Sequence, residues 1–256
     1  MPVCFGLLKM KKYVLAASLT AGLALIGAPS FAQVSGSVAA NYSRTDTSGP
    51  DTDTYGVNGG VAIPTGGGLA VLLDGSYAHN DDADLDLFDA RAHLITRNDS
   101  QAWGGYVSYA HADASGSNAN AWGVGGEYAK FFTNSTLALN LGYVNEDDVD
   151  VNATGLLGEY RIFASDNLRF DINAGYARVD TNFGDGDGTE IGAGVEYRFS
   201  AVPISIGANY SHFDTDIADS NVFGISLRYN FGSKSLKEDD RAGNTFGGRG
   251  LTAFVQ

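Results

Sequence analysis

A short pattern recurs six times along the chain and constrains its fold more than any other feature. Each copy reads tyrosine, any residue, then histidine, arginine or asparagine, any residue, then aspartate. The copies are YSRTD (42–46), YAHND (77–81), YAHAD (109–113), YVNED (143–147), YARVD (176–180) and YSHFD (210–214). Their tyrosines are 35, 32, 34, 33 and 34 residues apart. The pattern therefore indicates a repeated structural unit, and the His-x-Asp of the last copy is interpreted as architecture rather than a catalytic pair.

Between these copies lies a second phrase, in which a tyrosine is followed closely by another aromatic residue. It occurs as GGEYAKFF (125–132), GEYRIF (158–163), VEYRF (195–199) and LRYNF (227–231). Both halves of the unit alternate with a period of two, as where Leu137, Leu139 and Leu141 are separated by alanine and asparagine. Alternation over roughly ten residues is typical of β-strands and not of helices. Each unit therefore contains two strands.

The alternation marks about twelve segments, and the expected fold class is all-β. Their ranges are 34–45, 54–63, 69–80, 86–96, 101–112, 120–131, 136–146, 152–163, 168–180, 188–199, 203–213 and 221–231. We expect longer, acidic loops after the odd-numbered strands, as in FGDGDGTE (183–190), and tight turns after the even-numbered ones, as in PTGGG (64–68). The fourth segment is the least regular, because its alternation changes phase between Leu87 and Phe88.

Aromatic residues at both ends of the apolar face favour a membrane barrel over a soluble exported sandwich. Amphipathic rings are stable at the headgroup level of a bilayer, and a closed barrel pairs every backbone group inside it. We therefore predict a transmembrane, antiparallel, up-and-down β-barrel of about twelve strands. The predicted membrane-interface aromatics are Tyr42, Tyr77, Tyr109, Tyr143, Tyr176 and Tyr210 at one end, and Tyr128, Tyr160, Tyr197, Tyr229 and Phe231 at the other.

Residues 1–32 are interpreted as a cleaved signal peptide, with Met10 as a better start than Met1 because two lysines follow it. An apolar run comes next, and Ser30-Phe31-Ala32 offers the small residues that a signal peptidase reads. Cleavage would remove Cys4, the only cysteine, and with it any disulfide, thiolate ligand or lipid anchor. It would also remove three lysines and take the net charge from −14 to −17, which argues against nucleic acid as a partner.

Over residues 33–231 the sequence resembles the outer-membrane β-barrel proteins of Gram-negative bacteria, and their porin-like members in particular. The resemblance is one of overall pattern. Its most specific local match is Gly224-x-x-Leu227-x-Tyr229 with Phe231, which is similar to the last-strand signal that the family's assembly machinery reads. Family members commonly end at that aromatic, whereas this chain continues through residues 232–256. We expect this tail to be a flexible periplasmic extension; the alternative is that it folds back toward the lumen.

If the apolar phase faces outward, the opposite phase lines the lumen. The pore-lining candidates are Asp74, Arg91, His93, Glu127, Glu159, Arg161, Arg169, Asp171, Glu196, Arg198 and Arg228. Three pairs of opposite charge among them lie two residues apart on one strand face. Such a ladder can be structural, holding the barrel round, or can form a constriction with a transverse field that orders solutes. Small residues between the charges leave room for water in a barrel of this size.

The loops carry many carboxylates, so we expect an acidic vestibule that concentrates cations. DGDGTE (185–190) resembles part of a calcium loop but lacks the full twelve-residue pattern, and no metal site or cofactor is expected. The sequence also lacks the motifs of nucleophilic, phosphate-binding and zinc enzymes, so we expect no enzyme. His93 is interpreted as a hydrogen-bonded lumen residue rather than a general base.

These patterns predict an outer-membrane, porin-like channel for the passive diffusion of small hydrophilic solutes or ions, with a preference for cations. The first alternative is a non-conducting structural or surface-interaction barrel, and the second is an outer-membrane hydrolase. The expected partners are outer-membrane lipid and lipopolysaccharide, the assembly machinery at the last strand, and small hydrophilic solutes.

Overall fold

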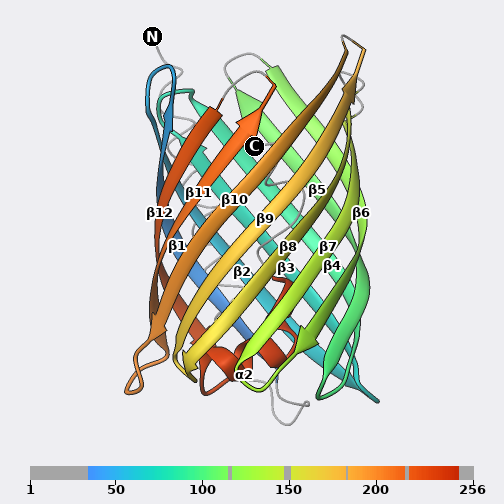
Figure 1. Ribbon diagram of the computed structural model, residues 1–256, viewed down its shortest axis with the longest axis vertical. Coiled ribbons are helices and arrows are strands. Elements are labelled where there is room, and N and C mark those ends of the chain that lie inside the picture. Colours follow the sequence, from blue (N-terminus) through green and yellow to red (C-terminus); the bar gives the residue numbers. More distant parts are fainter. Residues whose placement is uncertain (1–33, 115–116, 147–150, 183, 217–218, 248–256) are drawn as a thin grey trace, which may run out of the picture. The chain divides into compact units, whose positions relative to one another are not determined.

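Twelve antiparallel strands close into a barrel in the computed structural model, which describes residues 34–114, 117–146, 151–182, 184–216 and 219–247. The strands are β1 (Ser35–Thr47), β2 (Thr52–Gly66), β3 (Leu69–Asn80), β4 (Leu85–Arg97), β5 (Gln101–Ala114), β6 (Ser117–Phe131), β7 (Ser135–Glu146), β8 (Val151–Ser165), β9 (Leu168–Thr181), β10 (Gly184–Arg198), β11 (Ile204–Thr215) and β12 (Asp219–Phe231). Each strand pairs with its neighbours in the sequence, and β1 pairs with β12 to close the ring (Figure 1). The predicted fold class and strand number are confirmed. The expected signal peptide lies outside the described residues.

Strand β4 is regular, although its sequence alternates unevenly. It pairs with both β3 and β5 along its length without a register shift. Hydrogen bonds to two neighbours fix the phase of a strand, so every second residue faces the same side whatever its polarity. Phe88 therefore faces outward, where it is 46% exposed, and Leu87 faces inward.

The connections are short at both ends of the barrel, which corrects the expected contrast between long acidic loops and tight turns. No more than four residues separate the strands that meet at the end where the repeated tyrosines lie, called here the loop end. Most of FGDGDGTE belongs to β10, which begins at Gly184. The neighbouring strand holds its carboxylates in place: Tyr176 donates to Asp187 at 2.7 Å, and Arg178 donates to Asp185 at 2.6 Å.

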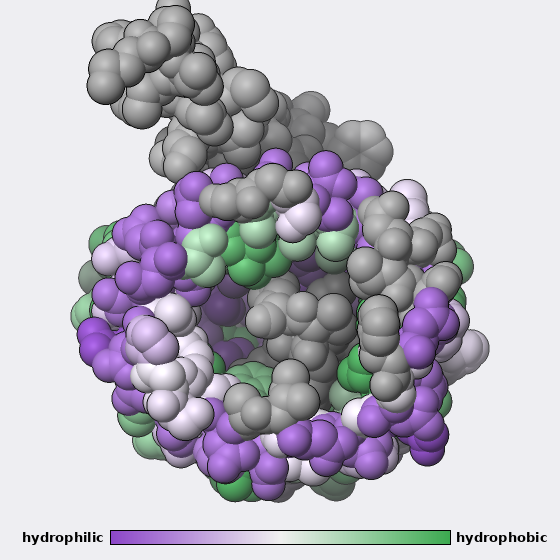
Figure 2. Space-filling view, turned by 90° about the horizontal axis from the view of Figure 1, so that it is seen from above, coloured by the Kyte–Doolittle hydropathy of each residue, from purple (hydrophilic) through white to green (hydrophobic). Residues whose placement is uncertain are grey.

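The outward face of the barrel carries the apolar band. Val107, Ile172 and Leu227 are 59%, 58% and 56% exposed. The eleven aromatic residues predicted for the membrane interfaces all lie on this outward face. Seen end-on, the barrel has hydrophobic residues along its flank and hydrophilic residues on its rim (Figure 2). This arrangement is the reverse of a soluble protein and matches a membrane-spanning barrel.

The repeated tyrosines have a structural role at the loop end. Each hydroxyl donates to an aspartate or asparagine on the following strand, and these acceptors recur every 32 to 35 residues. The six pairs are Tyr42–Asp53, Tyr77–Asp86, Tyr109–Asn120, Tyr143–Asn152, Tyr176–Asp187 and Tyr210–Asn221. His212 Nδ1 lies 3.1 Å from the same Asn221 side chain. The motif is therefore a cross-strand clasp, repeated around the barrel.

The chain continues beyond β12 and turns back into the barrel at Gly232, whose φ is 79°. Helix α2 (Leu236–Arg241) and the 3₁₀ turn η2 (Asn244–Phe246) follow, and α2 lies at the end of the barrel opposite the loop end (Figure 1). Residues 232–247 are thus ordered against the lumen wall, where we expected a flexible periplasmic extension; residues 248–256 lie outside the described part. None of the described helices is long and apolar enough to cross a membrane.

Candidate functional site: the lumen

The eleven residues predicted to line the pore all lie on the inner face of the barrel. Nine of them are at most 9% exposed, namely Asp74, Arg91, His93, Glu127, Glu159, Arg161, Asp171, Glu196 and Arg198. The side chains of Arg169 and Arg228 are more accessible, at 18% and 26%. The eleven residues form two clusters, one on β3, β4 and β6 and the other on β8, β9, β10 and β12.

The first cluster is centred on His93 of β4. Its ring nitrogens lie 2.7 Å from Asp74 Oδ2 and 3.1 Å from Glu127 Oε1. Ionised carboxylates only accept hydrogen bonds, so both nitrogens donate, as they do in the imidazolium form. Arg91 pairs with Asp74 at 2.9 Å and lies 3.4 Å from Asp89. All five side chains are at most 5% exposed, so this cluster is a closed structural network rather than a site open to solutes.

The second cluster contains the predicted ladder of opposite charges. Arg161 donates to Glu159 at 2.6 Å, two residues away on β8. Arg169 lies 3.3 Å from Asp171, two residues away on β9. Both pairs predicted from spacing on these strands are therefore formed.

The third predicted pair is wrong, because Glu196 takes its partners from other strands. Arg169 Nη2 lies 3.0 Å and Arg228 Nη1 3.5 Å from Glu196 Oε2. Arg198 extends instead to Ser233, just beyond β12, and donates to its carbonyl at 2.8 Å. Residues on adjacent strands are as close as residues two apart on one strand, so spacing alone does not choose between them.

Sequence reasoning missed Glu190, which is 7% exposed on the inner face of β10. It accepts hydrogen bonds from Asn173 at 2.5 Å and from Ser211 at 3.1 Å. Glu190 has the same alternation phase as Glu196 within the expected strand 188–199, and that phase was the available signal; it was instead counted with the acidic loop FGDGDGTE (183–190). Among the described residues, no group of three or more His, Cys, Asp or Glu side chains is placed to hold a metal ion.

The C-terminal segment, defined as residues 233–247, is bound to the lumen wall by charged residues. Asp240 accepts from Arg161 Nη1 at 2.5 Å and from Thr136 Oγ1 at 2.7 Å. At another part of the ring, Arg97 of β4 donates to the carbonyl of Arg241 at 2.5 Å. These polar contacts thus tie the segment to β4, β7 and β8.

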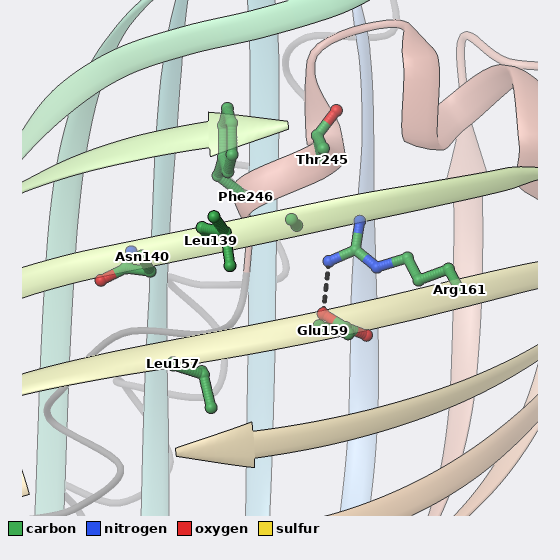
Figure 3. Close-up of a pocket in the computed structure, with 8 residues that line it drawn as sticks. Leu139, Asn140, Leu157, Glu159, Arg161, Thr245 and Phe246 are labelled. Carbon is green, nitrogen blue, oxygen red and sulfur yellow. Dashed lines mark hydrogen bonds and ion pairs between the residues drawn. The ribbon is translucent and has the colours of Figure 1, made fainter. Parts of the chain in front are cut away.

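Phe246 provides the apolar anchor of the same segment. It is 4% exposed and belongs to a buried cluster with Ala62, Leu72, Ile95, Ala102, Ala129, Phe131 and Ala138. The space left between Phe246 and strands β7 and β8 is a cavity of ≈ 20 Å³, room for about one water molecule (Figure 3). The segment therefore packs closely against the wall.

Asp239 makes the docking of this segment depend on pH. Its carboxylate is buried, accepts from Asn244 at 3.1 Å and from Ser233 at 3.2 Å, and has the charges of Arg228 and Glu196 nearby. Burial raises the pKa of Asp239 from its ordinary value of 3.8 to about 6. A carboxyl whose pKa is raised in the docked state binds its proton more tightly there. Docking is therefore strengthened as the pH falls through 6, and this gain is lost as the pH rises again.

We expect backbone amides of α2 to exchange about tenfold more slowly at pH 5 than at pH 7.5, after correction for intrinsic exchange rates. Hydrogen exchange followed by mass spectrometry measures this ratio. The Asp239→Asn variant is the control: it stays neutral at both pH values and should show equal protection. A wild-type ratio near one would contradict the assigned titration.

Comparison with known proteins places the chain among outer-membrane barrels. A family model described as Gram-negative porin matches residues 105–237. No curated protein matches the chain significantly. An outer membrane channel of Pseudomonas putida F1 is similar in structure, with a TM-score of 0.59 at 10% identity, over 80% of this chain and 97% of that one.

Two further solved structures share the fold. The translocator domain of the autotransporter NalP from Neisseria meningitidis has a TM-score of 0.51 at 13% identity, over 86% of this chain and 96% of that one. The KdgM porin, solved in complex with disordered oligogalacturonate, has a TM-score of 0.50 at 10% identity, over 75% of this chain and 99% of that one. At these identities the likeness concerns the fold alone.

Proposed function

Because the chain belongs to the Gram-negative porin family and forms a porin-like channel in the outer membrane, we propose that it carries small hydrophilic solutes or ions by passive diffusion. The observation that supports this most is the inner face of β10–β12. It carries Gly192, Gly194, Gly207, Asn209 and Ser226, and Asn209 is exposed to the lumen. Small polar side chains leave an aqueous path where bulkier residues would fill the barrel.

We further propose a preference for cations. At the loop end, exposed arginines are outnumbered by carboxylates: Arg44 lies near three aspartates and Arg178 near two. The negative potential of such a mouth raises the local concentration of cations and lowers that of anions. This argument depends on carboxylates at strand ends rather than on the long loops first expected.

In the lower lumen, Arg169 and Arg228 are the more accessible charged side chains, at 18% and 26%. The carboxylates of Glu159 and Glu196 pair with arginines, and these two glutamate side chains are only 5% exposed. We therefore expect Arg228→Gln to raise the cation-to-anion permeability ratio by about twofold, because one accessible positive charge is lost. Reversal potentials under a salt gradient in planar bilayers measure this ratio. Arg178→Gln removes an exposed arginine on the outer face of the loop end, where its charge lies outside the lumen, and should change the ratio less.

The channel itself is tested by recording from refolded residues 33–256 in planar bilayers. Discrete conductance steps support the proposal. Absence of steps in every salt gradient would instead favour the alternative of a non-conducting structural or surface-interaction barrel. One observation favours that alternative, namely the C-terminal segment docked across the lower lumen.

The proposed function includes no catalysis. The family match and the channel among the structural neighbours suggest a non-enzyme. Of the histidines, His93 is enclosed by two carboxylates and His212 belongs to the clasp with Asn221. Accordingly, His212→Ala should leave any activity measured on lipid or peptide unchanged.

We also propose that the barrel contacts outer-membrane lipid and lipopolysaccharide. The assembly machinery would bind it through the last strand. The support for these contacts is the outward face of β12, where Leu227 and Tyr229 are 56% and 46% exposed.

A further inference from the structure

We propose that the C-terminal segment, residues 233–247, is a tethered plug that closes the periplasmic end of the lumen and leaves it when the channel conducts. This proposal rests on the proposed diffusion function, because a barrel that never conducts has nothing to close. We assign this end to the periplasm as part of the proposal; β1 begins and β12 ends there. Nothing in the diffusion function alone requires the chain to continue past β12.

The segment contacts the lumen wall at points spread around the ring of strands. Near its start, Lys237 lies 3.6 Å from Asp166 in the turn between β8 and β9. In its middle, Arg241 donates to the carbonyl of Thr133, in the turn between β6 and β7, at 3.2 Å. At its end, η2 contacts β2, and Phe246 is buried among inward-facing residues of β2–β7. A chain that meets β2, β4, β7 and β9 obstructs the path between them.

The barrel does not depend on the segment for its own pairing. The ring is closed by β1 and β12, whose paired residues run from Gly36–Phe231 to Thr47–Ser220. Arg161, the main anchor for Asp240, also has Glu159 as a partner at 2.6 Å on its own strand. Arg161 would therefore stay charge-compensated if the segment left, as a removable plug requires.

The tether is a single residue with a special conformation. Gly232 has a φ of 79°, and a β-carbon added there would collide with the carbonyl oxygen of Val34. Glycine is thus required to turn the chain from the rim of β12 into the lumen. The segment itself carries three basic and three acidic residues, so it is neutral as a whole and is held by local pairs rather than by net charge.

The decisive experiment locks the plug in place with a disulfide. A β-carbon built on Gly243 lies 3.1 Å from the β-carbon of Ala62 on β2. This is shorter than the separation of about 3.5–4.5 Å found in disulfides, so the segment must shift by a few tenths of an ångström to form the bond. The refolded chain 33–256 has no cysteine of its own, so Ala62→Cys with Gly243→Cys introduces one defined pair. Planar-bilayer recording then compares the oxidised channel with the same channel after dithiothreitol.

We expect the oxidised channel to lose most of its open events and the reduced channel to regain them. The two single-cysteine variants should be insensitive to oxidant and reductant, which separates locking from the strain of a cysteine at position 243.

In the opposite direction, Asp240→Asn should raise the open probability about tenfold, because a buried ion pair is broken. Deletion of residues 233–256 should give a permanently open channel of at least about twice the wild-type conductance.

The results that would refute the plug differ from those that would refute passive diffusion through the barrel. Steps of equal size and frequency in the wild type, the oxidised and reduced double-cysteine variant, and Asp240→Asn would refute the plug and leave the channel intact. No steps in any variant, with the plug deleted or released, would refute both. If the deletion variant does not fold, the full-length lock and Asp240→Asn still decide the question.

Discussion

Replacing His93 by alanine is expected to lower the free energy of unfolding by about 3–5 kcal/mol, the typical cost of removing one member of a buried ion pair. His93 lies between Asp74 and Glu127, and the three side chains are at most 3% exposed. Alanine would leave the Glu127 carboxylate buried without the positive charge that it faces. It would also open a space next to Tyr106, whose ring centroid is 5.4 Å from that of the histidine.

Guanidinium unfolding of the refolded protein in lipid vesicles measures this loss. The matched control is His111→Ala, since His111 lies at the loop end on the outer face and bonds Asn120 at 2.9 Å. That variant should change stability by less than about 1 kcal/mol. Adding Glu127→Gln to His93→Ala should recover part of the stability, because the uncompensated charge is removed. A loss equal to that of His111→Ala would show that the His93 cluster is not stabilising.

The second large effect is expected from a charge on the lipid-facing surface. Ile172 lies midway along the apolar face of β9 and is 58% exposed. We expect Ile172→Arg to destabilise the folded barrel by about 2–4 kcal/mol, the cost of an arginine near the middle of a bilayer. The same substitution at Asn209, which is exposed to the lumen, should cost less than about 1 kcal/mol because the new side chain meets water.

Folding titrations of both variants in vesicles measure the difference between the two faces. Equal costs at Ile172 and Asn209 would contradict the assignment of the apolar phase to the lipid. In detergent micelles the difference should shrink, because the detergent layer adapts more easily to a charged side chain than a bilayer does. The comparison therefore tests the membrane position of the barrel separately from its fold.

Much of the fold could be predicted from the sequence. A two-residue period of apolar side chains indicates a β-strand and also shows which residues lie on the same face of the barrel wall. The alternation of Leu137, Leu139 and Leu141 with smaller residues places them outward, and the structure agrees. Strand ends were less accurate, as β10 shows, because acidic and glycine-rich residues are ordinarily typical of loops. Only the cross-strand partners, such as Tyr176 for Asp187, explain why the strand extends so far.

The partners of charged residues were harder to predict than their positions. Glu196 was correctly placed inside, but its arginine partners come from β9 and β12, and a sequence does not state how strands are staggered. The C-terminal segment was harder still. Its polar composition is typical of a disordered tail. Its order depends on Arg161 and Thr136, which are distant in the chain and become neighbours of Asp240 only in the closed barrel.

The lumen exists only once β1 has paired with β12. Gly36 at the start of the barrel sequence pairs there with Phe231 at its end. Before that seam is joined there is no enclosed interior, and the C-terminal segment, which follows β12, has nothing to enter. The C-terminal segment can therefore occupy the lumen only after that seam is joined.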